Sequence, residues 1–186
     1  QYAEFIDNLS KSLVDYLIIT STNGAEAMIS LSSDFMSQDD FIKLISETNI
    51  IAIGPVSAGA LSNLNIHVSE IPSEYSSRGI VESLSGKVKG KNVYILRSDH
   101  GDKILSQGLT DAGANVTDIP VYRLMKTKDE DLMNLARMTL AGEIDAFAFT
   151  SALSASSFIE AVCSLSDEAV SKINSATVAA IGYPTK

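Results

Sequence analysis

The stretch YLIITSTNGAEAM (residues 16–28) places a short apolar run before a cluster of hydroxyl and amide side chains and a segment with helical spacing. This order is typical of a buried parallel strand that feeds a crossover helix. The stretch DAFAFTSALSASSF (residues 145–158) repeats the pattern near the other end of the chain. The two copies indicate an α/β fold built from repeated strand–helix units.

Each copy is followed by a second matching segment, NIIAIGPVSAGAL (residues 49–61) or TVAAIGYPTK (residues 177–186). Thr20 and Gly54 are 34 positions apart, Thr150 and Gly182 are 32 apart, and the copies are therefore offset by 128 to 130 positions. A repeat of this spacing predicts two similar domains. The second copy stops where its helix should begin, so we expect the chain to be part of a longer protein.

Further segments extend the alternation of strands and helices. The predicted strands are residues 16–20, 50–54, 66–70, 92–97, 116–122, 145–150 and 177–182. Helical spacing covers residues 25–35, 77–84, 102–113, 129–142 and 154–165. This alternation predicts parallel sheets with crossover helices.

Composition narrows the function classes. The 14 Lys and Arg against 23 Asp and Glu give a formal net charge of −9, which argues against binding to nucleic acid or to an anionic membrane. No apolar run is long enough to span a bilayer, and the first residues lack the pattern of a signal peptide, so we expect a cytoplasmic protein. Cys163 is the sole cysteine, and its helical surroundings predict a buried, inert thiol.

Five features occur in a fixed order along the chain. They are a strand–TS–helix unit, a strand–IGP–helix unit, the turn LRSDHG (residues 96–101), the segment GANVTDIPVYR (residues 113–123), and a second FTS and IG pair. In this order and spacing they resemble the uroporphyrinogen-III synthase family over nearly all 186 residues.

The resemblance implies two flavodoxin-like parallel-sheet domains joined by two extended crossings. Residues 121–128 are the candidate for one crossing and residues 1–5 for the other. Residues 1–122 would be a complete inserted α/β domain. Residues 123–186 would be an incomplete second domain that lacks its opening βαβ unit and its final helix and strand.

The resemblance also implies a lyase that works without metal or organic cofactor. It would cyclise hydroxymethylbilane, its small-molecule partner, to uroporphyrinogen III by inverting the last pyrrole ring and losing water. The protein would act as a monomer without nucleic acid or membrane. Positioning of the substrate, rather than a strong acid–base pair, would carry the catalysis.

Ligands of parallel α/β sheets bind beyond the carboxyl ends of the strands, at helix N-termini. The predicted substrate-binding residues there are Thr20, Ser21, Thr22, Asn23, Gly54, Pro55, Val56, Ser57, Ser98, Asp99, Thr150, Ser151, Ala152 and Thr185. Any one hydroxyl among them could equally be an ordinary helix cap, which needs no ligand. Basic side chains would reinforce the local field for an anionic substrate, and the candidates are Arg78, Arg97, Lys103, Arg123 and Lys186.

Tyr122 ends the segment VTDIPVY and matches the tyrosine of the family's VY motif. The resemblance implies that Tyr122 faces the cleft and is the catalytic residue. A phenol is protonated at neutral pH and can donate a hydrogen bond to the departing hydroxyl. The alternative is a partly buried tyrosine that locks the hinge between the domains.

Rival functions have weaker support in the sequence. Adjacent residues such as Asp99, His100 and Asp102 rarely converge on one metal ion. A covalent hydrolase would need a GxSxG turn, which the chain lacks. A phosphorylatable regulatory domain would need Asp at its strand ends, where Thr, Ser and Gly stand instead. The alternative that stays open is a two-domain, non-catalytic binding protein for a small anionic ligand.

Overall fold

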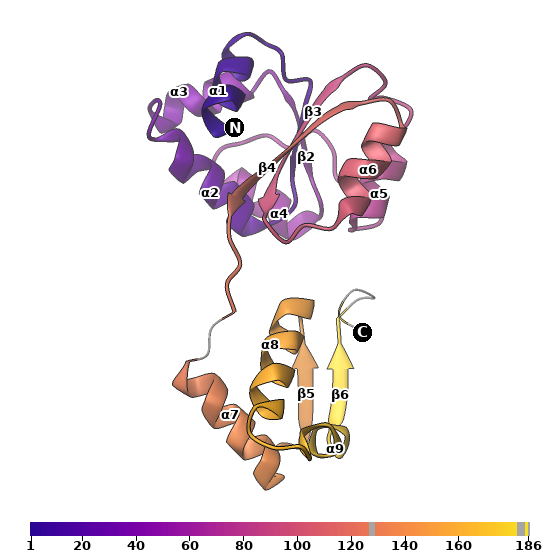
Figure 1. The fold of residues 1–186 in the computed structure, drawn as a ribbon. Helices are drawn as coiled ribbons and strands as arrows, with labels where there is room; N and C mark the ends of the chain where they lie inside the picture. The colour runs from indigo at the N-terminus through magenta and orange to yellow at the C-terminus, as the bar shows by residue number, and fades with distance from the viewer. Residues whose placement is uncertain (127–128, 182–184, 186) are drawn as a thin grey trace. The chain divides into compact units, whose positions relative to one another are not determined.

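The computed structural model describes residues 1–126, 129–181 and 185, and the chain divides into two units, Gln1–Leu124 and Met125–Lys186. Strands and helices alternate along both units (Figure 1). All paired strands run parallel. The predicted α/β class with parallel sheets is therefore confirmed.

The first unit is built on a four-stranded sheet with the order β2-β1-β3-β4. Its strands are β1 (Tyr16–Ile19), β2 (Asn49–Ala52), β3 (Asn92–Ser98) and β4 (Asn115–Tyr122). The chain places β2 on one side of β1 and then returns to place β3 on the other. The direction of strand addition therefore reverses between β1 and β3, which is where open α/β sheets bind ligands.

Helices cover both faces of this sheet (Figure 1). One face carries α1 (Tyr2–Ser10), α2 (Thr22–Ser32), α3 (Gln38–Ile45) and α4 (Pro55–Asn63), and the other carries α5 (Ser77–Leu84) and α6 (Lys103–Asp111). Side chains of β1 alternate between the two cores, with Leu17 and Ile19 in the first and Ile18 in the second. Because both faces are buried, the strand is continuously apolar, as the sequence showed.

The prediction of an extended crossing in residues 1–5 is wrong, because these residues begin α1. Phe5, Ile6 and Leu9 of this helix are all buried in the core of the first unit. Their spacing of one, three and four residues is that of an amphipathic helix, so hydrophobic burial favours a helix over an extended strand here.

The predicted strand at residues 66–70 is also wrong. The backbone contact with β2 is confined to an isolated bridge between Glu70 and Ile51 and to the N–H of Ser69, which donates to the carbonyl of Ile50 at 2.8 Å. The side chain of Ser69 explains the interruption, because its Oγ accepts the hydrogen bond from Ile50 N–H at 3.1 Å. A side-chain oxygen occupies the place of a backbone carbonyl, and the ladder does not extend.

Asp15 joins three strands at the amino edge of the sheet. Its carboxylate accepts hydrogen bonds from Asn92 N–H at 2.8 Å and from Lys91 Nζ at 2.9 Å. Its backbone carbonyl accepts the N–H of Asn49 at 3.2 Å. Partial burial alone would raise the pKa of Asp15, but the Asn92 and Lys91 hydrogen bonds outweigh it and hold the pKa below its usual value.

We expect Asp15→Asn to destabilise the protein more at pH 7 than at pH 3. A lowered pKa means that the folded state favours the ionised carboxylate of Asp15. The ionised carboxylate therefore stabilises the fold fully at pH values above the usual carboxyl pKa. This stabilisation is lost as the pH falls from that value through the lowered pKa of the folded state. Urea midpoints of the variant and parent at both pH values measure the effect. Asp7→Asn, which breaks the exposed pair with Lys11, is the control and should change little. A stability gap that is equal at both pH values would contradict the prediction.

The second unit contains a two-stranded parallel sheet of β5 and β6. Its elements are α7 (Glu130–Ala141), β5 (Ala146–Phe149), α8 (Ala152–Cys163), α9 (Ala169–Asn174) and β6 (Thr177–Ala180). Phe147, Phe149 and Phe158 form an aromatic cluster with ring centroids 5.0 to 6.1 Å apart. This cluster packs α8 against the sheet and gives the unit its own core.

The expectation of a buried thiol at Cys163 is wrong, because Cys163 is exposed at the last position of α8. The preceding residues Ala161 and Val162 take the core-facing positions of the same turn. Among the described residues, no helix combines the length and the apolar character that crossing a lipid bilayer requires.

Candidate functional site

The residues predicted after β1, β3 and β4 meet at the carboxyl edge of the first unit's sheet. The first turn of α2 approaches the end of β3 closely, since a Cβ placed on Gly24 would lie 3.4 Å from the carbonyl oxygen of Leu96. The close approach brings the N-terminus of α2 to the point where the strand order reverses. Its unpaired N–H groups and partial positive charge favour an anionic group there.

A hydrogen bond joins Ser21 to Tyr122 across this edge, with 2.9 Å between Ser21 Oγ and Tyr122 OH. Ser21 is also the N-cap of α2, and its Oγ accepts the N–H of Gly24 at 3.0 Å. A hydroxyl can accept two hydrogen bonds and donate one, so capping and the contact with Tyr122 are compatible. Ser21 therefore fixes the phenol of Tyr122 beside the helix N-terminus.

A β-bulge sets the direction of the Tyr122 side chain. The pairing of β3 with β4 shifts between Arg97, opposite Pro120, and Ser98, opposite Tyr122, which leaves Val121 as the extra residue. Neighbouring residues of a regular strand point to opposite faces. Here both Val121 and Tyr122 pack on the core face shared with α2, so the bulge turns Tyr122 toward Ser21.

Asp99 holds the chain that leaves Tyr122. Its Oδ1 accepts the N–H of Leu124 at 3.1 Å and a hydrogen bond from His100 Nδ1 at 2.8 Å, and its own N–H donates to the carbonyl of Tyr122 at 3.2 Å. The His100 hydrogen bond, followed by that of Leu124, lowers the pKa of Asp99. The carboxylate of Asp99 thus binds the backbone that follows Tyr122. We infer that Asp99 positions this segment, in addition to the predicted contact with substrate.

Arg97, expected to strengthen the positive field, is buried and paired within the protein. Its guanidinium contacts both carboxylate oxygens of Asp118 and donates to the carbonyl of Asp102 at 2.5 Å. The pair neutralises the charge of Arg97, so this side chain adds little to the field. A pocket of about 390 Å³ beside it is lined by Ser98, Asp99 and Lys103.

Sequence reasoning missed Asp118, Ser106 and Gln107 at this edge, and all three line the 390 Å³ pocket. Ser106 and Gln107 lie just after the LRSDHG turn, on the first turns of α6. Polar residues that follow such a turn were the signal that could have identified them.

The loop after β2 presents the N-terminus of α4 with Gly54 as its N-cap and Pro55 at its first position. Val56 is 78% exposed, whereas Ser57 is 5% exposed. Within the described part of the chain, the hydroxyl of Ser57 has no hydrogen-bond partner, yet it is not sealed from solvent. Such a hydroxyl can serve a ligand, and the role of these four residues stays a prediction.

The second unit repeats the capping geometry of the first. Ser151 is the N-cap of α8, and its Oγ accepts the N–H of Ser154 at 3.1 Å, as Ser21 accepts that of Gly24. Thr150 and Ala152 beside it are exposed, and Thr185 is half-buried. Lys186, predicted to reinforce the positive field, lies outside the described residues.

The other predicted binding residues vary in exposure. Thr20, Thr22 and Ser98 are half-buried, while Asn23, Arg78 and Arg123 are exposed. Across the part of the chain that the structure describes, no three His, Cys, Asp or Glu side chains lie close enough to hold a metal ion. The groups at this edge include hydroxyls, a phenol and backbone N–H groups that can form hydrogen bonds, beside the charged side chains of Asp99 and Lys103.

The fold and this edge define an α/β protein with parallel sheets and a candidate ligand site at the carboxyl ends of the strands. The chain belongs to the uroporphyrinogen-III synthase HemD family, whose sequence model matches residues 1–186. The family predicted from the order of the motifs is thus confirmed.

Individual relatives agree with this assignment. The chain is 27% identical over 173 residues to a putative uroporphyrinogen-III synthase of Methanothermobacter thermautotrophicus, covering 90% of this chain and 65% of that protein. It is 27% identical over 149 residues to the uncharacterized protein YjjA of Bacillus subtilis, covering 78% of this chain and 54% of that protein. The chain therefore spans only about half to two thirds of the length of these relatives.

A solved structure has the same fold. It is a mutant uroporphyrinogen III synthase from Thermus thermophilus, with a TM-score of 0.64 and 18% identity. The match covers 100% of this chain and 72% of that one. At this identity the likeness concerns the fold.

Proposed function

We propose that this chain forms the greater part of a uroporphyrinogen-III synthase that cyclises hydroxymethylbilane to uroporphyrinogen III. Residues 1–122 would be the inserted domain and residues 123–186 part of the second domain. The enzyme would act in the cytoplasm as a monomer, without metal, cofactor or nucleic acid. Family membership supports the reaction class, and the Ser21–Tyr122 pair is the observation that carries the mechanism.

In the proposed reaction, the nitrogen lone pair of a terminal pyrrole expels the hydroxyl of the hydroxymethyl group, which leaves as water after taking up a proton. The resulting azafulvene is attacked by the substituted carbon of the last pyrrole, which gives a spiro intermediate. That intermediate opens and closes again with the last ring inverted, and the ring carbon that forms the new bond loses a proton, which balances the proton taken up by the departing hydroxyl. Tyr122 would donate a hydrogen bond to the departing hydroxyl, and Ser21 would hold the phenol in that direction.

Substrate binding would rest on many weak contacts with the carboxylates of hydroxymethylbilane. Each carboxylate at an exposed helix N-terminus is stabilised by about 0.3–1 kcal/mol. The helices α2, α4 and α8 begin at the carboxyl edges of their sheets and supply such N-termini. These contacts are local, so they are compatible with a net charge of −9.

We expect Ser21→Ala to lower turnover about tenfold, because the phenol of Tyr122 loses the group that orients it. The change also removes the cap of α2, which costs about 1 kcal/mol of stability. Ser37→Ala is the matched control, since Ser37 caps α3 in the same way and has no contact with Tyr122. Steady-state kinetics on the full-length protein, beside thermal melting, separate the two effects.

The expected result is a similar loss of stability in both variants and a fall in kcat in Ser21→Ala alone. Ser21→Thr, which keeps a hydroxyl and the cap, should recover most of the turnover. Equal kcat in Ser21→Ala and Ser37→Ala would remove Ser21 from the mechanism. Tight binding of hydroxymethylbilane without any turnover by the parent would instead support a non-catalytic binding protein.

A further inference from the structure

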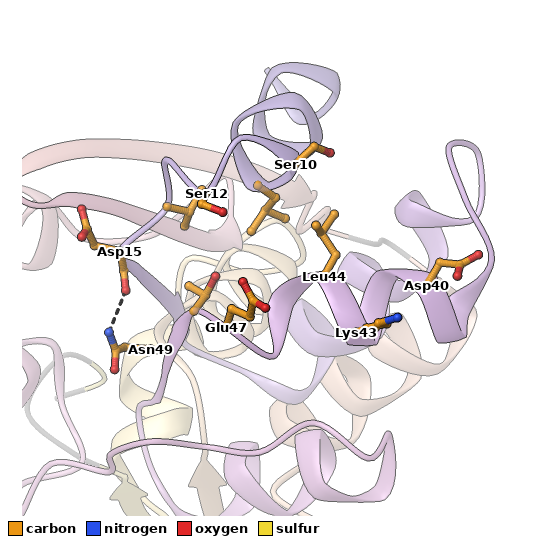
Figure 2. Close-up of a pocket in the computed structure, with 11 residues that line it drawn as sticks. Ser10, Ser12, Asp15, Asp40, Lys43, Leu44, Glu47 and Asn49 are labelled. Atoms are coloured by element: carbon orange, nitrogen blue, oxygen red, sulfur yellow. Dashed lines mark hydrogen bonds between the residues drawn. The ribbon is translucent and has the colours of Figure 1, made fainter.

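A second pocket lies at the amino edge of the first unit's sheet, at the opposite end of the strands from Ser21 and Tyr122. It has a volume of about 470 Å³ and is bounded by the carboxyl-terminal ends of α1 and α3 and by the residues that open β1 and β2. Figure 2 shows Asp15 and Asn49 at one end and Asp40 and Lys43 at the other, with Ser12 and Glu47 between them.

The charges around this pocket favour a cation. Asp15, Asp40 and Glu47 line it, against the single ammonium of Lys43. Asp15 is already paired with Lys91, and Asp40 lies at the same end as Lys43 (Figure 2). Glu47 has no cationic partner among the described residues. The carboxyl-terminal ends of two helices add partial negative charge from their unpaired carbonyls.

Thr48 adds an independent observation, because its side chain is 9% exposed and lines the pocket. Within residues 1–126, its hydroxyl has no hydrogen-bond partner, yet no unpartnered side-chain oxygen in this part of the chain is sealed from solvent. Thr48 Oγ1 is therefore open to solvent, and the residue lines the pocket. A hydroxyl that is free of partners within the protein and open to solvent can hydrogen-bond to a ligand in the pocket.

Ser12 points to the same pocket from the end of α1. Its φ of 54° is left-handed, and the N–H groups of Ser12 and Leu13 close the helix on the carbonyls of Leu9 and Asn8 at 2.9 Å. Glycine is the residue preferred at this position. Serine at this position makes the fold less stable than glycine would, but it places a hydroxyl in the lining of the pocket.

We propose that this pocket binds a small organic cation that carries a primary ammonium group. An ammonium has three N–H donors and no acceptor. The Glu47 carboxylate supplies the opposite charge, and the hydroxyls of Thr48 and Ser12 supply two further acceptors. The site is separate from the edge assigned to the tetrapyrrole, because Asp15 precedes β1 and Ser21 follows it.

The probe for this site is 1,4-diaminobutane, titrated against the protein and followed by residue-resolved NMR shifts and by calorimetry. The matched neutral molecule is 1,4-butanediol, which has the same length and similar hydrogen bonding, and Mg²⁺ tests a cation without N–H donors. We expect saturable shifts around Thr48 and Glu47 with the diamine only. Equal responses to the diol or to Mg²⁺ would overturn the proposal, as would shifts that never saturate.

Three variants test the residues themselves. Glu47→Gln and Thr48→Val should each weaken binding of the diamine on the order of tenfold, since the first removes the negative charge opposite the ammonium and the second removes a hydrogen-bond acceptor. Glu82→Gln removes an exposed carboxylate on α5 and should leave the affinity unchanged. Ser12→Gly should raise the melting temperature of the protein and lower its affinity for the diamine. A purely structural role for Ser12 would predict no change in the affinity. Unchanged affinity in all three pocket variants would refute the assignment.

Discussion

Replacing Tyr122 by Phe is expected to lower the turnover of hydroxymethylbilane about a hundredfold, which is the lower end of what one positioned proton donor contributes. The phenol hydroxyl is the only group removed, and it is the group held 2.9 Å from Ser21 Oγ. The ring itself, which packs on the core beside α2, remains. The folded state should therefore keep its thermal midpoint close to that of the parent.

Tyr16→Phe is the control for this experiment. It makes the same chemical change at the amino-terminal end of β1, away from the carboxyl edge. Steady-state rates of both variants on the full-length protein give the comparison, with KM separated from kcat. A Tyr122→Phe protein with parental kcat would leave Tyr122 only the alternative role of locking the hinge.

Gly79→Ala should cost about 3 kcal/mol of unfolding free energy, because overpacking a buried contact with the backbone cannot be relieved by a side-chain rotation. Gly79 lies in the first turn of α5, and its N–H donates to Ser76 Oγ at 3.1 Å. A Cβ at Gly79 would lie 2.0 Å from the carbonyl oxygen of Glu74. The chain that leads into α5 would have to move away from the helix.

Gly59→Ala is the matched control, since Gly59 is exposed within α4 and a Cβ there meets no atom within 4 Å. Alanine in such an open helical position stabilises by about 0.5–1 kcal/mol. Urea denaturation should thus show midpoints that move in opposite directions for the same substitution. A Gly79→Ala midpoint at or above that of the parent would contradict the close contact with Glu74.

Local pattern was enough to predict the fold class, because β1, β2 and β3 are short apolar runs that are followed by polar or glycine-containing turns. The predicted strands at 16–20, 50–54 and 92–97 each match an observed strand to within two residues. Because β1 and β3 are buried on both faces, the middle of each strand is continuously apolar and shows no alternation of polar and apolar residues. The helix predicted at residues 77–84 coincides with α5.

Tertiary contacts decided the elements that the sequence misplaced. Residues 66–70 have the composition of a strand, but the hydroxyl of Ser69 accepts the Ile50 N–H in place of a backbone carbonyl and interrupts the ladder. The β-propensity of a segment does not indicate such a side-chain hydrogen bond. Residues 1–5 were predicted to be an extended crossing because the resemblance to the family placed one there. The spacing of Phe5, Ile6 and Leu9 is, however, that of a helix.

Residue type and position identified Ser21 and Tyr122 as candidates but did not show how they interact. The two residues are 101 positions apart, and their contact depends on the bulge at Val121. A bulge moves every later side chain of a strand to the other face, and nothing in VTDIPVY marks where the extra residue falls. The pairing of Arg97 with Asp118 was hidden for the same reason, since it depends on the register of β3 and β4.

The most direct test of the proposed function is an assay of the product isomer. Hydroxymethylbilane is supplied to the full-length protein, and the type III uroporphyrinogen is separated from the type I isomer that forms spontaneously. The Ser21–Tyr122 site predicts that type III predominates in the parent and falls toward the background in Tyr122→Phe. Type I at the spontaneous rate, from protein shown to be folded, would contradict the synthase and leave the binding protein as the function.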